Sequence, residues 1–93
     1  MTARKTQPRM SKFEEWFRTF IEEKDLPVVE FEIEHNGIVH YLDNYDAVEI
    51  ICNAMSPDDQ EKVKDVIIRL DFMNGDINHF LKYIAENYIR MKY

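Results

Sequence analysis

The chain has 93 residues, of which 45% are hydrophobic and 13% are aromatic, and it carries a formal net charge of −6. This length suits one domain with a single core, and the hydrophobic content excludes a disordered chain. The sequence has no apolar run long enough to span a membrane, no secretory signal pattern, and only one cysteine, Cys52, which excludes an internal disulfide.

Residues 1–10 are polar and basic and show no hydrophobic period, so we predict a flexible basic tail there. Residues 11–93 are then expected to form a single domain. Ser11 and Glu14 have the spacing of a capping box, in which each side chain accepts a hydrogen bond from the other residue's amide. Pro27 disfavours helix at the residue before it, which predicts that the first helix ends near Lys24 or Asp25. The apolar stripe of this helix contains Phe13, Trp16, Phe17, Phe20 and Ile21.

The hydrophobic period then changes from that of a helix to that of a strand. Apolar residues alternate with glutamates from Val29 to Glu34. Asn36–Gly37 follows, which is typical of a two-residue hairpin turn of type I′. We therefore predict a β-hairpin whose second strand covers residues 38–42. With that loop length, Ile33 lies opposite His40, so the His40 side chain is expected to point toward the core.

Three further helices are predicted in the second half of the chain. Asp43 or Asn44 can cap the first, and Ser56 with Pro57 is a strong start for the second. The second helix is expected to end with Gly75 in the left-handed conformation. The last helix follows at once, with an apolar face formed by Ile77, Phe80, Leu81, Ile84, Tyr88 and Met91.

Together these elements predict an α+β fold, in which one β-hairpin packs on about four helices in the order α-β-β-α-α-α. The expected core contains Trp16, Phe17, Phe20, Phe31, Ile33, Leu42, Ile51, Val66, Leu70, Phe80, Leu81 and Ile84.

The sequence contains no recognisable catalytic or metal-binding motif. Ser11 and Ser56 are explained as helix caps, and Cys52 lies in an apolar run typical of a core thiol. The three histidines do not show paired metal-ligand spacing. We therefore predict a protein that is not an enzyme and has no catalytic residue, no cofactor and no metal ion. A cryptic enzyme would need a pocket that gathers His40, Cys52 and a carboxylate.

The acidic charge is concentrated in residues 13–65, where fifteen acids against four basic residues give a net charge of −11. Glu30, Glu32 and Glu34 fall on one strand face at intervals of about 6.6 Å, which is comparable to the spacing of phosphates along a DNA strand. We predict that this region imitates nucleic acid and binds a basic protein. The alternative is a solvated face that keeps the hairpin from pairing with other edges. The candidate partner-binding residues are Glu30, Glu32, Glu34, Tyr41, Asp43, Asp46, Glu49, Asp58 and Asp59.

The segments 16–27 (WFRTFIEEKDLP) and 71–78 (DFMNGDIN) resemble small proteins that are encoded by phages and mobile elements of Gram-positive bacteria. The resemblance covers residues 10–91. It implies a cytoplasmic, host-directed or accessory role in a bacterial cell, the setting of the small acidic inhibitors of host nucleases of the anti-CRISPR and anti-restriction type. It assigns no role to any residue.

The expected function is thus an acidic inhibitor that occludes the basic nucleic-acid-binding surface of a host nuclease, with neither nucleic acid nor membrane as its direct partner. One alternative is a small regulatory nucleic-acid-binding protein that uses the basic tail and the last helical hairpin, whose polar side chains include Asn78, His79 and Lys82. A second alternative is a phage accessory protein with another role. The many aromatic residues would also suit a homodimer interface.

Overall fold

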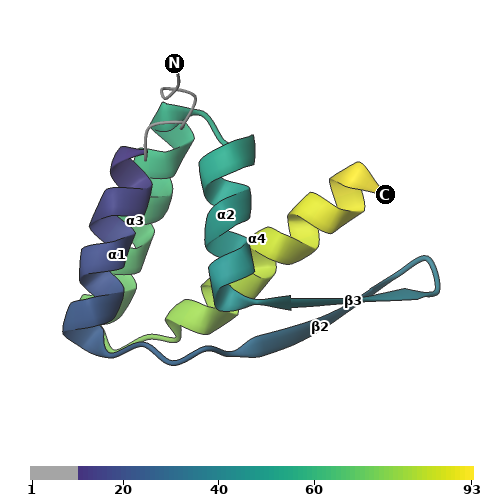
Figure 1. Cartoon of the computed structure of the whole chain (residues 1–93), viewed down its shortest axis with the longest axis horizontal. Coiled ribbons are helices and arrows are strands. Elements are labelled where there is room, and N and C mark those ends of the chain that lie inside the picture. The colour runs from purple at the N-terminus through teal and green to yellow at the C-terminus, as the bar shows by residue number, and fades with distance from the viewer. Residues whose placement is uncertain (1–10) are drawn as a thin grey trace, which may run out of the picture.

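The computed structural model of the chain describes residues 11–93, so the predicted basic tail over residues 1–10 lies outside the described residues. The fold is α+β with the predicted order, as Figure 1 shows. Its elements are α1 (Lys12–Lys24), β2 (Glu30–His35), β3 (Ile38–Asp43), α2 (Asn44–Ala54), α3 (Pro57–Phe72) and α4 (Ile77–Lys92).

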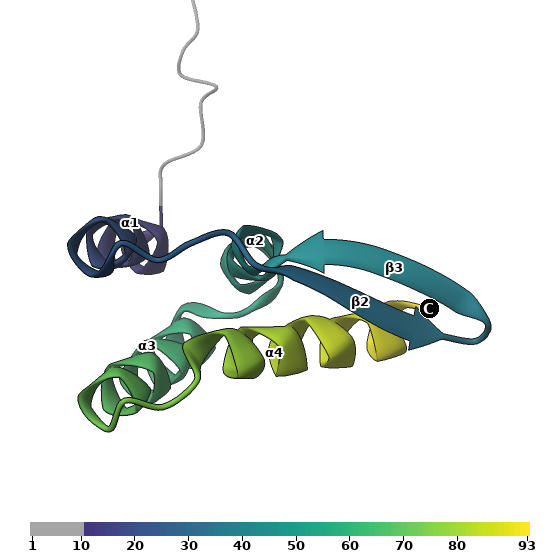
Figure 2. The same cartoon turned by 90° about the horizontal axis from the view of Figure 1, so that it is seen from below.

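The elements lie in two layers, which are clearest from below (Figure 2). One layer contains α1, α2 and the hairpin, and the other contains α3 and α4. α4 runs along the inner face of the hairpin and also contacts α2, while α1 contacts both α2 and α3. The hairpin therefore projects to one side of the helices, with its inner face on α4 and its outer face toward solvent. Among the helices of residues 11–93, none combines the length and the apolarity that a membrane crossing would need.

Side-chain caps begin the helices where the sequence predicted them. The Ser11 hydroxyl accepts from the Glu14 amide, and Ser56 and Asp76 cap α3 and α4 in the same way. Of the predicted first capping box, the hydrogen bond from the Glu14 amide to the Ser11 hydroxyl is confirmed, and the Glu14 carboxylate pairs with Arg18 at 3.3 Å.

The hairpin has the predicted turn and register. Asn36 and Gly37 both have positive φ, at 54° and 79°, which a type I′ turn requires. Ile33 lies opposite His40, and Glu32 lies opposite Tyr41. A two-residue loop allows only one pairing of the strands that keeps the apolar residues of β2 on one face.

The turn between α3 and α4 differs from the prediction in one respect. Asn74, with φ of 58°, takes the left-handed position that was predicted for Gly75. The Gly75 amide instead donates to the Leu70 carbonyl at 2.7 Å, and a Cβ at Gly75 would lie 2.7 Å from Leu70 Cδ2. A side chain at Gly75 would therefore require the Leu70 side chain to move, while the left-handed φ of the turn is taken by Asn74.

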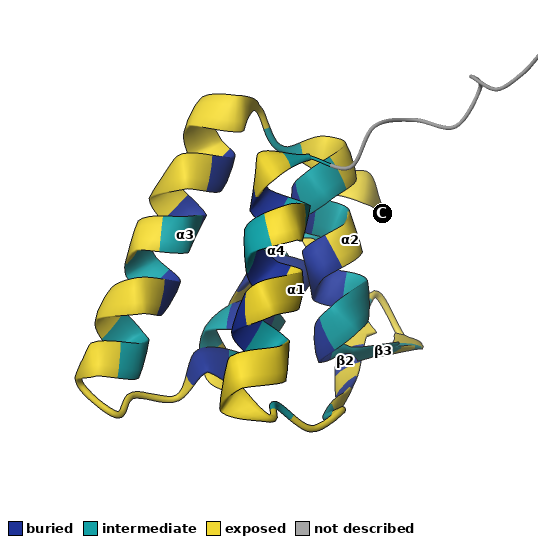
Figure 3. Cartoon of the chain, turned by 60° about the vertical axis from the view of Figure 1, so that its left-hand side comes forward, coloured by how far each residue is buried: buried dark blue, intermediate teal, exposed yellow. Residues whose placement is uncertain are grey.

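The core lies where the two layers meet, and Figure 3 shows the buried stripe of each helix turned toward its neighbours. Fifteen hydrophobic residues of the described chain are buried: Phe13, Phe17, Phe20, Phe31, Ile33, Ala47, Val48, Ile51, Val63, Ile67, Ile77, Leu81, Ile84, Ala85 and Ile89. Several residues of the predicted core are only partly buried, namely Trp16, Leu42, Val66, Leu70 and Phe80.

Two of these departures have clear physical causes. Trp16 lies at the border between α1 and α3, where the Lys64 ammonium sits 5.8 Å from the ring centroid, whereas Phe13 faces the interior. On α4 the buried residues are Ile77, Leu81, Ile84, Ala85 and Ile89, so the buried face extends to Ala85 and Ile89, toward α2 and the hairpin, and leaves Phe80 only partly buried. Met91, which was predicted on the apolar face, is 87% exposed.

Candidate partner-binding surface

The outer face of the hairpin carries a row of three exposed glutamates, Glu30, Glu32 and Glu34, which we call the glutamate row. Side chains alternate along a strand, so these three point away from α4 while Phe31 and Ile33 are buried against the helices. Tyr41 lies opposite Glu32 on the same face, and 74% of its surface is exposed. The sequence pattern predicted this arrangement, because both strands keep a period of two through the turn.

The glutamate row is not neutralised by the part of the chain that the structure describes. The ion pairs among residues 11–93 join Glu14 to Arg18, Lys24 to Asp71 and Asp59 to Lys62. None of them includes a residue of the row. Neighbouring charges of the row, about 6.6 Å apart, lie within one Debye length (about 8 Å) of each other at physiological salt, so the potentials of neighbours add. The outer face therefore attracts cationic groups, and high salt weakens that attraction.

Asp43 and Asp46, two further candidate residues, hold the start of α2. The Asp46 amide donates to Asp43 Oδ1 at 2.7 Å, and the Asp43 amide donates to Asp46 Oδ2 at 2.9 Å. This reciprocal pair is a capping box, and the carboxylates also suit the positive end of the helix dipole. Both residues are partly buried. The capping of α2 is therefore a sufficient reason for an acidic side chain at each position, without a partner.

The remaining candidate acids do not join the glutamate row. Asp58 and Asp59 lie in the first turn of α3, beyond the far end of α2, as Figure 1 shows. The eleven residues of α2 place that turn about 16 Å from the hairpin along the helix axis. Glu49 is exposed on α2 between the two. The structure therefore brings together five of the predicted residues, which are the glutamate row, Tyr41 opposite Glu32 and Asp43 opposite Glu30, and the Asp43 carboxylate among them is engaged in the α2 cap.

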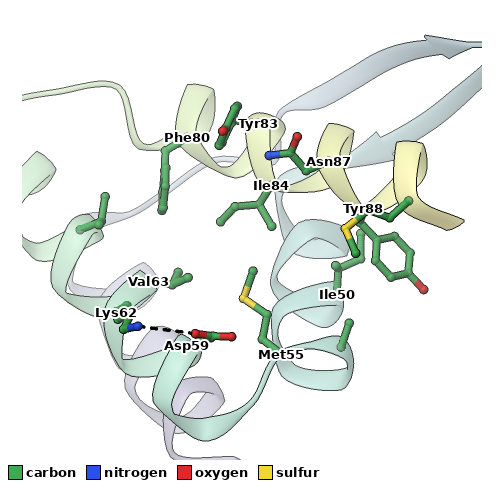
Figure 4. Close-up of a pocket in the computed structure, with 13 residues that line it drawn as sticks. Ile50, Met55, Asp59, Lys62, Val63, Phe80, Tyr83, Ile84, Asn87 and Tyr88 are labelled. Carbon is green, nitrogen blue, oxygen red and sulfur yellow. Dashed lines mark ion pairs between the residues drawn. The ribbon is translucent and has the colours of Figure 1, made fainter.

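A groove of about 500 Å³ lies between α2, α3 and α4, and the sequence did not predict it. Figure 4 shows Met55, Val63 and Ile84 around its floor, with Phe80 directed into it from α4. An ion pair between Asp59 and Lys62 lies at its rim. Residues such as Phe80 and Val66 have the spacing of core residues, so no sequence signal separated them from the core.

His40 and Cys52, whose side chains could in principle act as a base or a nucleophile, lie apart from the glutamate row. His40 is partly buried on the inner face of the hairpin, its ring centroid is 5.0 Å from that of Tyr93, and its Nε2 has no hydrogen-bond partner among the described residues. The Ser11 hydroxyl donates to Cys52 Sγ at 3.6 Å. Burial raises the pKa of the Cys52 thiol, and the Ser11 hydrogen bond opposes that rise. A raised pKa keeps the thiol protonated and weakly nucleophilic at neutral pH.

The cavity beside His40 does not gather the groups that a cryptic enzyme would need. Its lining includes Asp46, Glu49 and Tyr93, but not Cys52. Within residues 11–93, no three His, Cys, Asp or Glu side chains are close enough together to hold a metal ion. What the described surface offers is a row of carboxylates beside one exposed aromatic ring.

Comparison of the chain with protein-family models, with curated proteins and with solved structures finds no match.

Proposed function

We propose that this protein is a non-enzymatic binding protein whose glutamate row occupies a basic nucleic-acid-binding surface of another protein. The observation that carries the proposal is the exposure of Glu30, Glu32 and Glu34 on one strand face, without an ion pair to any described residue. Carboxylates at this spacing can meet the lysine and arginine side chains that would otherwise contact successive phosphates. Tyr41 adds an exposed ring on which an arginine guanidinium can stack.

The proposed setting is a bacterial cell in which a phage or mobile element supplies the protein against a host nuclease, as anti-CRISPR and anti-restriction proteins do. Such nucleases bind nucleic acid through basic channels, so an acidic competitor needs charge complementarity more than a large apolar interface. A net charge of −6 on 93 residues is also expected to speed its association with a basic partner.

The alternative, a nucleic-acid-binding protein that uses α4 and the basic tail, has less support. Asn78, one of the polar side chains expected on the binding side of α4, accepts a hydrogen bond from the buried Asn44. Asp58 and Asp59 are exposed at the start of α3, where they would repel a phosphate backbone. The second alternative, an accessory protein with another role, is tested by the same experiment, in which it would retain a partner that does not bind nucleic acid.

The proposal is tested with the full chain, immobilised through a tag and incubated with a bacterial lysate, with and without nuclease treatment. We expect a basic nucleic-acid-binding protein to be retained at about 50 mM salt and released as salt rises toward about 500 mM. The retained protein is then assayed for loss of DNA or RNA binding when this chain is added. Inhibition that disappears at high salt is the expected result.

Charge-reversal variants decide which surface acts. The triple variant Glu30→Lys, Glu32→Lys, Glu34→Lys should abolish binding and inhibition. The matched control reverses three exposed acids of α1, Glu15→Lys, Glu22→Lys, Glu23→Lys, with the same change in net charge. If both variants lose binding equally, net charge alone explains the binding and the glutamate row has no special role. If the hairpin variant binds as the wild type does, the proposal is rejected. Retention of nucleic acid alone would favour the α4 alternative.

A further inference from the structure

Within β2, the backbone N–H and C=O groups that do not bond to β3 belong to the three residues of the glutamate row. In an antiparallel pair, opposite residues alternate between pairs that exchange two backbone hydrogen bonds and pairs that exchange none. The type I′ turn makes His35 and Ile38 a bonded pair. At the other end, the Asn44 amide donates to the Val29 carbonyl at 3.0 Å, which continues the same alternation.

Counting along β2 from either end gives the same result. Phe31 and Ile33 exchange hydrogen bonds with β3, whereas Glu30, Glu32 and Glu34 lie in the non-bonded pairs. The N–H and C=O groups of the three glutamates therefore point away from β3, toward the outer edge of the hairpin. The sheet has two strands, so no other strand among residues 11–93 pairs with this edge. Figures 1 and 2 show that the edge of β2 is also uncovered by the helices.

We infer that the edge of β2 accepts an extended basic segment of the partner as an added strand, with lysine or arginine at every second residue; this inference rests on the proposed function of the glutamate row. A segment in that position bonds to the three outward N–H and three outward C=O groups. Its alternate side chains lie about 5 Å from the glutamates on the same face and repeat at the same interval of about 6.6 Å. The backbone supplies affinity, and the carboxylates select positive charge.

The same geometry argues against a second copy of this chain at the β2 edge. Antiparallel pairing of two β2 strands would place glutamates of one copy opposite glutamates of the other, and like charges directly opposite destabilise a sheet. The β3 edge differs, because Val39 and Tyr41 there are exposed without a row of acids. The occupant expected at β2 is therefore a basic segment of another protein.

The test uses the full chain and two synthetic peptides of about nine residues, a length that a strand of this size can pair with. In one peptide lysine alternates with threonine, and in the other the same residues are arranged with all lysines together. We expect the alternating peptide to bind at least about tenfold more tightly by fluorescence anisotropy at low salt. Equal affinity of the two peptides, or binding of neither, overturns the inference.

Two substitutions separate the backbone edge from the charge. Glu32→Pro removes an outward N–H and leaves the ladder to β3 intact, whereas Glu32→Gln removes only the charge. We expect Glu32→Pro to weaken binding of the alternating peptide about tenfold beyond Glu32→Gln. Val39→Pro, at a non-bonded position of the β3 edge, is the matched control and should bind as the wild type does. Equal loss in Glu32→Pro and Glu32→Gln overturns the edge inference.

Hydrogen exchange on the unaltered chain gives a readout that does not depend on a variant. The amides of Glu32 and Glu34 should become protected when the alternating peptide binds, while those of Phe31 and Ile33 are already protected in the ladder. Absence of new protection at Glu32 and Glu34 under saturating peptide overturns the inference. A different result would contradict the proposed function, namely that the charge-reversal variant of the glutamate row still binds the partner.

Discussion

The side-chain amide of Asn44 donates from Nδ2 to Oδ1 of Asn78 at 3.1 Å, which joins the first turn of α2 to the first turn of α4. Its second N–H donates to the Pro27 carbonyl at 2.9 Å, and its Oδ1 accepts from the Val29 amide at 3.0 Å. Asn44 is only 1% exposed, so a buried polar side chain is satisfied from three directions. One residue thus connects the segment before β2 with two helices.

Replacement of Asn44 by leucine is expected to destabilise the protein by about 1–3 kcal/mol, because it leaves the partly buried Val29 amide, Pro27 carbonyl and Asn78 side chain without their partner. The measurement is urea unfolding followed by circular dichroism. Asn53→Leu is the matched control, since Asn53 is an exposed asparagine on the same helix and its loss should change stability by no more than about 0.5 kcal/mol. Similar effects of the two substitutions would contradict the role of the Asn44 network.

Gln60 joins α3 to the end of α2 and gives a second stability prediction. Its Nε2 lies 3.2 Å from the carbonyl oxygens of Ile51, Cys52 and Met55 at the C-terminal end of α2, where helix carbonyls run out of amide donors from a following turn. The Ile51 carbonyl also accepts from the Met55 amide at 3.2 Å. Gln60→Met keeps the size and removes the donor, so we expect a loss of about 1–3 kcal/mol in the free energy of unfolding. The exposed neighbour Glu61→Met serves as the control. Equal stability of Gln60→Met and the wild type would show that these carbonyls do not need the amide.

Removal of the polar group at His40, unlike that at Asn44 or Gln60, is not expected to lower stability. Its Nε2 is buried without a hydrogen-bond partner among the described residues, and its ring contacts that of Tyr93. Phenylalanine keeps an aromatic contact and removes the unsatisfied nitrogen. We predict that His40→Phe leaves the melting temperature unchanged or raises it, as measured by differential scanning calorimetry. A clear fall would mean that the imidazole makes a polar interaction in solution.

Cys52 gives a prediction on pH. Burial raises the pKa of the thiol above its ordinary value of 9.0, so the folded protein holds the thiol proton more tightly than the unfolded chain does. This contribution to stability is fully present below the unfolded pKa and is lost as the pH rises through the folded pKa. The stability of the wild type should therefore fall more steeply above about pH 8.5 than that of Cys52→Ala. Parallel stability curves for the two proteins in that range would contradict the shift.

Most of the local structure follows from signals that lie within a few residues of one another. The caps at Ser56 and Asp76, and the Asn36–Gly37 turn with its register, each depend on contacts within about four residues. The glutamate row was predictable for the same reason, because strand alternation and loop length determine which face each side chain takes.

The predictions of burial that were wrong concern contacts between elements. Trp16 and Phe13 lie on one stripe of α1, and only the position of α3 leaves Trp16 partly open while Phe13 is buried. Met91 and Ile89 both follow the period of α4, yet the hairpin and α2 cover the side of Ile89. A helical stripe is wider than the surface that neighbours bury, so spacing alone does not decide which side of it becomes core.

The sequence by itself determined the element order, the helix starts, the hairpin register and the exposure of the glutamate row, since each depends on backbone geometry and neighbouring side chains. Only the tertiary structure decided that Asp58 and Asp59 lie far from the hairpin, that Asn44 and Gln60 are buried, and that a groove opens between α2, α3 and α4. The physical reason is that burial and charge proximity are set by which elements pack together. That packing brings together residues far apart in the sequence, such as Asn44 and Asn78, and no local pattern encodes it.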